Sequence, residues 1–168
     1  MILDDIHALK PHMTRGRRLL GLDVGTKTIG LALSDVRLIV ATPCRLIRRT
    51  KFAKDAAAIG DMVKDQDVGG IVIGLPVSMD GSEGPACQSV RAFAANLEAR
   101  FQAQGLDRVA IGFWDERLST AAVERMLIGE ADLSRARRKR VVDKVAAAYV
   151  LQGALDALRQ SSDKRQSS

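Results

Sequence analysis

Three carboxylates of this chain stand at the ends of predicted secondary-structure elements. Asp23 ends an apolar run near the N-terminus, and Glu116 closely follows the apolar run 109–114. Asp143 stands near the start of the predicted helix 141–158, where a spacing of about 100° per residue puts it on the small-residue face. A carboxylate that faces an apolar layer must be protonated or bind a cation. The three positions therefore predict a carboxylate cluster that binds cations.

A cluster of this kind is typical of metal-assisted phosphate chemistry. Carboxylate oxygens are suitable ligands for Mg²⁺ or Mn²⁺. Two such ions, about 3.5–4 Å apart, can activate a water and stabilise the leaving oxygen of a phosphodiester. We therefore expect Asp23, Glu116 and Asp143 to be both the catalytic and the metal-binding residues of a hydrolase. Each also has a simpler explanation, as an incidental hairpin residue (Asp23) or as a helix-start residue that interacts with the helix dipole.

Positive charge is concentrated in two stretches of the chain. The net charge is +6 and the pI about 9.7, which favours a polyanionic partner without proving one. We expect the first stretch to follow a phosphate backbone beside Asp143, and it contains Arg135, Arg137, Arg138, Lys139 and Arg140. The second can extend that footprint, and it contains Arg45, Arg48, Arg49, Lys51 and Lys54. Because aromatic residues are only 4% of the chain, we expect recognition of backbone and shape rather than base stacking.

The order of the predicted elements indicates the fold class. Strands are predicted at 18–23, 28–34, 38–46, 70–75 and 109–114, and helices at 52–64, 86–104, 119–127 and 141–158. Pro43 suggests an edge position or a break for the third strand, and 130–140 is predicted as a charged loop. Three sequential strands followed by strand–helix alternation predict an α/β fold, a ribonuclease H-like mixed five-stranded sheet flanked by helices. The domain is expected over 17–160, with an N-terminal extension at 1–16 and a flexible tail at 161–168.

The loop after the fourth predicted strand should lie at the same edge of the sheet as the carboxylates, because ligand sites lie at the carboxyl ends of parallel strands. It spans 74–84 and is rich in Gly, Ser and Asp. Ser78 and Ser82 are candidate donors to phosphate oxygens, and Glu83 is a candidate accessory carboxylate. A plain connecting loop explains this composition equally well.

Four stretches together resemble the YqgF/RuvX family of Holliday junction resolvase-like proteins, also described as pre-16S rRNA nucleases. They are GLDVGTKTIGLALSD, IVIGLPVSMDGSEG, DERLST and VDKVAAAYVLQ, and the resemblance covers about residues 18–158. It implies a metal-dependent nuclease that matures the 5′ end of pre-16S rRNA, with Asp23, Glu116 and Asp143 as the family's acidic residues. Lys27, Arg117 and Ser119 lie inside the matching motifs and, with Arg137, Arg138, Lys139 and Arg140, are the expected nucleic-acid-binding residues.

Three alternatives stay open at this point. The chain could resolve branched DNA, or act without catalysis as a nucleic-acid-binding factor in ribosome assembly or transcript processing. The glycine-rich turn after Asp23 is also found in ATP-dependent phosphotransferases, although one domain supplies only half of their cleft. The N-terminal residues do not resemble a signal peptide and no apolar run is long enough for a membrane span, so we expect a cytoplasmic protein, as a monomer or a homodimer.

Overall fold

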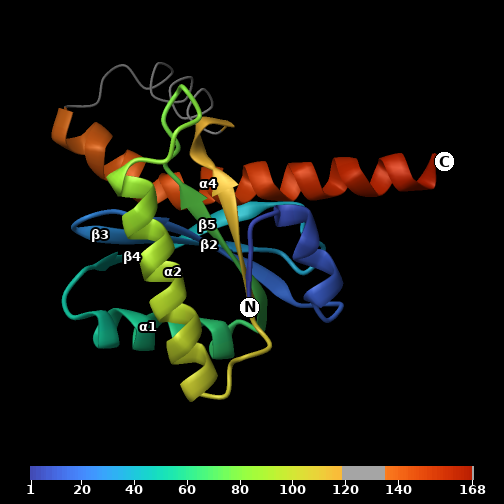
Figure 1. The fold of residues 1–168 in the computed structure, drawn as a ribbon, viewed down its shortest axis with the longest axis horizontal. Helices are drawn as coiled ribbons and strands as arrows, with labels where there is room; N and C mark the ends of the chain where they lie inside the picture. The colour runs from blue at the N-terminus through green and yellow to red at the C-terminus, as the bar shows by residue number, and fades with distance from the viewer. Residues whose placement is uncertain (119–134, 168) are drawn as a thin grey trace.

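A six-stranded mixed sheet with helices on both faces forms the centre of the protein (Figure 1). The computed structural model describes residues 1–118 and 135–167, and only the backbone of 135–144. The strand order is β1-β6-β5-β2-β3-β4. The strands are β1 (Ile2–Leu3), β2 (Arg18–Val24), β3 (Thr28–Ser34), β4 (Ala41–Arg48), β5 (Val68–Leu75) and β6 (Ala110–Asp115).

The central strands are the most apolar part of the chain. All eight residues of β5 are buried, as expected for a parallel strand that is covered on both faces. β5 pairs in parallel with β2 and β6, while β2–β3 and β3–β4 are antiparallel hairpins. The carboxyl ends of β2, β5 and β6 therefore lie at one edge of the sheet.

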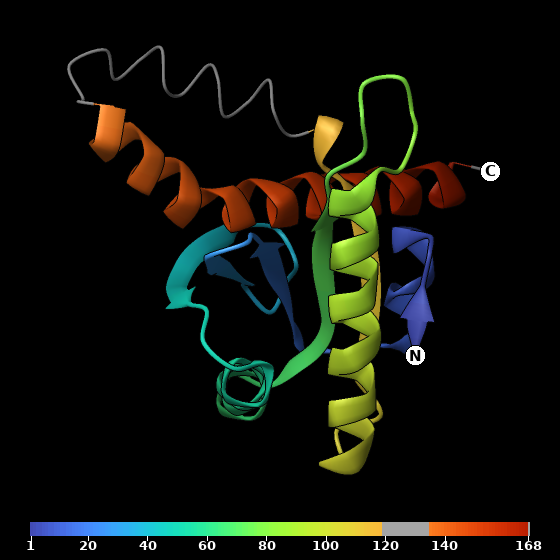
Figure 2. The same cartoon turned by 60° about the vertical axis from the view of Figure 1, so that its left-hand side comes forward.

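Helices cover the two faces in two separate layers (Figure 2). Helices α1 (Phe52–Asp65) and α2 (Pro85–Ala103) pack on one face, and α4 (Arg135–Gln166) crosses the other. The side chains of β2 alternate between these layers, with Leu20 and Leu22 on the α1/α2 side and Leu19 on the α4 side. The same alternation places Asp23 on the α4 side.

The sheet has one strand more than the five predicted from the sequence. The extra strand is β1, which lies in the segment 1–16 and pairs in parallel with β6 through Ile2↔Ile111 and Leu3↔Gly112. Two further residues of this segment, Ile6 and Leu9, are buried on the α4 side of the sheet. The N-terminal extension is therefore packed onto the domain. The predicted edge position of the strand with Pro43 is confirmed, because β4 is the last strand of the sheet.

Helix α4 is longer than the sequence pattern indicated, with 32 residues. Residues 135–140, predicted as part of a charged loop, form its first turns, and residues 161–166, expected in a flexible tail, form its last. Both segments are polar, and Figure 2 shows both ends of α4 extending beyond the sheet. None of the described helices is long and apolar enough to cross a membrane. The predicted helix 119–127 lies outside the described residues.

Candidate active site

Two of the three predicted catalytic carboxylates meet at the carboxyl edge of the sheet. Asp23 is the last residue but one of β2 and pairs in register with Gly30 of β3, and Glu116 is the first residue after β6. Their side chains share a hydrogen bond. Burial, the negative charge of Asp23 and this hydrogen bond together raise the pKa of Glu116 to about 7. Near neutral pH the Glu116 carboxyl is therefore about half protonated.

A glycine on the intervening strand makes room for this pair. Gly74 of β5 lies between β2 and β6, beside Trp114 in register. A Cβ atom at Gly74 would lie 2.5 Å from Oε1 of Glu116 and 2.9 Å from Cγ2 of Val150 in α4. Any larger residue would therefore displace the Glu116 carboxylate or the helix. The sequence analysis missed this role, although a glycine inside a buried strand is itself a sign of a close approach.

Asp143, the third predicted carboxylate, belongs to α4. It precedes Ala147 by four residues, and a Cβ atom at Gly21 of β2 would lie 3.0 Å from the carbonyl oxygen of Ala147. The helix thus passes directly over the strand that carries Asp23. The side chain of Asp143 lies outside the described residues.

The Asp23–Glu116 pair is chemically suited to a divalent cation. Two carboxylates in contact, one of them with a raised pKa, have negative charge that a nearby cation would stabilise. Their oxygens are the ligands that Mg²⁺ and Mn²⁺ prefer. Among the described side chains no group of three or more candidate ligands is found, so this pair would supply part of a metal's coordination.

The neighbouring carboxylate, Asp115, has a different role. It forms an ion pair with Arg117, with 2.6 Å between Oδ2 and Nη2, and also accepts the backbone N–H of Arg117 at 3.0 Å. These hydrogen bonds lower the pKa of Asp115. Arg117, predicted to bind nucleic acid, also donates to the carbonyl oxygen of Ser78 at 3.4 Å. In this structure Arg117 therefore connects the end of β6 to the loop 76–84.

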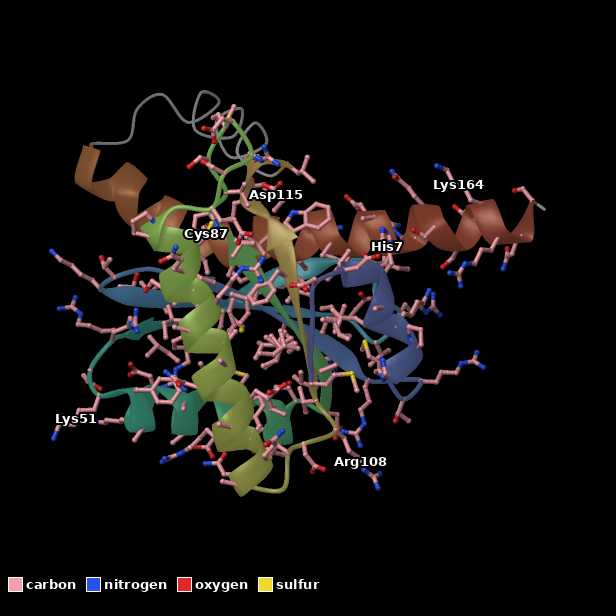
Figure 3. All side chains as sticks on the ribbon, viewed as in Figure 1. His7, Lys51, Cys87, Arg108, Asp115 and Lys164 are labelled. Carbon is pink, nitrogen blue, oxygen red and sulfur yellow. The ribbon has the colours of Figure 1, made fainter. Side chains whose placement is uncertain are left out.

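The loop 76–84 stands above the sheet beside Asp115 (Figure 3) and is held by its own hydrogen bonds. Ser82, a candidate phosphate donor, donates its hydroxyl to Asp80 at 2.6 Å. Glu83, a candidate accessory carboxylate, forms an ion pair with Arg91 at 2.6 Å instead. Its carboxylate is thus satisfied at the junction of this loop with α2.

The structure describes the remaining predicted nucleic-acid-binding residues to different extents. Lys27 is exposed in the turn between β2 and β3, next to the strand that carries Asp23. Ser119 lies outside the described residues. The basic run lies at the start of α4, where the structure describes only the helical backbone. Its predicted binding residues are Arg137, Arg138, Lys139 and Arg140.

Comparison with known proteins identifies the family. A family model described as "RuvX: Holliday junction resolvase" matches residues 17–157. The chain belongs to the RuvX family. A relative from Rhodospirillum centenum is 57% identical over 160 residues, which cover 95% of this chain and 84% of the relative. A second, from Paramagnetospirillum magneticum, is 62% identical over 144 residues, covering 86% of this chain and 88% of the relative. Both carry the name "Putative pre-16S rRNA nuclease".

Solved structures of two resolvases have a similar fold. Thermus thermophilus RuvC in complex with a Holliday junction superposes with a TM-score of 0.55 at 13% identity, over 84% of this chain and 94% of that one. The yeast mitochondrial Holliday junction resolvase Ydc2 gives a TM-score of 0.51 at 10% identity, over 88% and 82%. These likenesses confirm the predicted ribonuclease H-like α/β fold. The family match and the relatives named as nucleases class this RuvX protein as a nuclease, a hydrolase of phosphodiester bonds.

Proposed function

We propose that this RuvX protein is a divalent-metal-dependent nuclease that matures the 5′ end of pre-16S rRNA. The observation that carries the proposal is the contact between Asp23 and Glu116 at the carboxyl edge of the sheet, with the pKa of Glu116 raised to about 7. A structural role alone would not favour two like charges in contact, because each destabilises the ionised form of the other. The RNA substrate is inferred from the name that the relatives carry.

Asp23 and Glu116 would hold the metal, and we propose Asp143 as a further ligand. Helical periodicity supports this, because residues 143, 147 and 150 fall on one side of α4 and Val150 approaches Gly74. Bound Mg²⁺ or Mn²⁺ would supply Lewis-acid stabilisation of the phosphodiester oxygens and a lower pKa for the attacking water. The chain itself holds the Glu116 carboxylate in place over Gly74, beside Val150 of α4.

The test combines cleavage and metal binding. We expect purified protein with Mg²⁺ or Mn²⁺ to shorten a pre-16S rRNA fragment, and Asp23→Asn and Asp143→Asn to abolish cleavage and weaken Mn²⁺ binding in calorimetry. Asp61→Asn is the matched control, because Asp61 is an exposed carboxylate on α1. Equal cleavage by the wild type and both site variants would reject the site.

The same variants separate the alternatives in cells depleted of the protein. We expect the wild type and Asp61→Asn to restore mature 16S 5′ ends, and Asp23→Asn to leave precursor ends. Rescue by Asp23→Asn would instead support a non-catalytic factor in ribosome assembly. Cleavage of a four-way DNA junction without cleavage of rRNA would support the resolvase activity that the family description names.

A further inference from the structure

Four exposed cations extend along β4 and into the start of α1. We call Arg45, Arg48, Lys51 and Lys54 the basic track. Among the side chains that the structure describes, none of the four forms an ion pair. The stretch 41–54 contains no acidic residue, and the next one, Asp55, is 3% exposed and accepts hydrogen bonds from Thr50. The positive charge of the track is therefore not neutralised locally.

The track passes the catalytic edge at its second residue, Arg48. Arg48 pairs in register with Thr28, the first residue after the turn that follows Asp23. The next residue, Arg49, joins this turn to β4, because its backbone N–H donates to the carbonyl oxygen of Lys27 at 2.8 Å and its Nη1 donates to that of Gly25 at 2.7 Å. The two lysines follow Arg48 along the chain, and Figure 3 shows Lys51 at the lower left of the view and Asp115 near the top.

Arg49 itself is not part of the track. Its guanidinium lies 5.5 Å from the ring centroid of Phe93, and that ring packs edge-on against Phe52 at 5.6 Å. It is only partly exposed and its hydrogen bonds are made within the protein. Arg49 therefore fixes the geometry between the turn and the track, while the other cations remain open to solvent.

We infer that the basic track binds the phosphate backbone of the nucleic acid substrate outside the cleavage site. The inference rests on the proposed nuclease function. Arg45 and Arg48 are about 10 Å apart along β4 at 3.3 Å per residue, and because they are three residues apart their side chains leave opposite faces of this edge strand. The two lysines follow at the start of α1. Unneutralised cations on both faces of an edge strand, continuing into the next helix, can contact a polyanion whose charges repeat along its axis. The enzyme should therefore need a substrate that continues past the scissile phosphate.

A different explanation is that these cations protect an edge strand from pairing with other chains. Charged side chains on edge strands have this effect, and β4 is the last strand of the sheet. Lys51 and Lys54 lie beyond the end of β4, where they cannot protect it. Edge protection therefore does not account for the whole track.

The experiment measures binding with cleavage switched off by Asp23→Asn. The track variant carries Arg45→Gln, Arg48→Gln, Lys51→Gln and Lys54→Gln. The control variant has the same change in charge at exposed cations elsewhere, with Arg15→Gln, Arg37→Gln, Lys64→Gln and Arg108→Gln. The affinity of each variant is measured for RNA and DNA duplexes of two lengths. The short duplexes end near the cleavage point, and the extended ones continue for one helical turn, about 34 Å, on either side.

We expect the track variant to bind an extended duplex about 10- to 100-fold more weakly than the parent, and a short duplex within about threefold. The slope of log K against log salt should fall by about 2–4 for the extended duplex only. Equal losses for the track and control variants, or equal losses on short and extended duplexes, would overturn the inference. Aggregation of the track variant with unchanged affinity would assign the residues to edge protection.

The outcomes also separate this inference from the proposed function. If the wild type cleaves neither RNA nor DNA while length-dependent binding persists, the nuclease proposal fails and the track stands. If cleavage is found but the track variant binds every duplex as the parent does, the nuclease proposal stands and the track fails. The RNA and DNA arms show which backbone the track prefers.

Discussion

Asp115 and Glu116 are neighbours in the sequence but lie in opposite electrostatic environments. Asp115 pairs with Arg117, which holds its pKa below the usual range. Glu116 contacts Asp23 on the other side of the sheet, and its pKa is raised to about 7. One carboxylate stabilises the end of β6, and the other is kept at a free-energy cost. Such a cost at a sheet edge is typical of a functional group.

The alternation of a strand explains why two adjacent residues differ so much. Successive side chains point to opposite faces, so the side chain of Trp114 packs on the α4 side and that of Phe113 on the α1/α2 side. Asp115 points to the same side as Phe113, next to the loop 76–84. Glu116 points to the α4 side, over Gly74. The comparison separates a structural carboxylate from a candidate catalytic one.

The largest expected effect is a difference in activity between variants of Glu116 and of Asp115. Glu116→Gln should lower kcat by about 10³-fold or more, equivalent to about 4 kcal/mol in activation free energy, because it removes a proposed metal ligand. Asp115→Asn should lower kcat by less than about tenfold, since it acts only through Arg117 and the loop. Single-turnover cleavage at saturating Mn²⁺ measures both. Similar losses in the two variants would contradict the separation of roles.

A smaller effect concerns the space between the two carboxylates. Gly74→Ser should reduce the free energy of unfolding by about 1–3 kcal/mol, because the new side chain overlaps Glu116 and Val150. Gly84→Ser is the matched control, since nothing lies within 4 Å of a Cβ atom there and serine is accepted at a helix N-cap. Urea unfolding compares the two. If both serines are tolerated equally, the close approach over Gly74 is not required.

The sequence allowed the meeting of Asp23 and Glu116 to be predicted because the physics involved is local. Apolar runs mark β2 and β6, and the carboxyl ends of parallel strands meet at one edge. Gly74 escaped notice because its importance comes from side chains that arrive from another strand and another helix. Arg117 was predicted to contact substrate, although its spacing of two residues from Asp115 was a signal for the observed pair.

The errors in the fold have a common physical origin. β1 has two residues and no periodic pattern of its own, so it exists only through pairing with β6. Residues 135–140 and 161–166 are polar and were assigned to a loop and a tail, whereas Arg, Lys and Gln are good helix formers that prolong an already packed helix. Polarity indicates exposure, and exposure does not distinguish a loop from a helix end.

The smallest expected effect is on how the free energy of unfolding depends on pH. Because the folded state raises the pKa of Glu116 from 4.5 to about 7, the native protein binds more protons there than the unfolded chain, and its stability falls as pH rises through this range. Without divalent metal, Glu116→Gln should therefore stabilise the protein at pH 8 by about 1–3 kcal/mol and change little at pH 4.

Asp115 should behave in the opposite way. Its lowered pKa contributes stability above the ordinary carboxylate range, and this contribution is lost as pH falls. Asp115→Asn should thus destabilise the protein at pH 8 by about 0.2–1 kcal/mol, because the ion pair is partly exposed, and less at pH 3. Urea unfolding at each pH, with Asp61→Asn as the control, measures whether each variant raises or lowers the free energy of unfolding. Destabilisation by Glu116→Gln at pH 8 would show that Glu116 is a structural carboxylate like its neighbour, and the contact with Asp23 would lose its catalytic meaning.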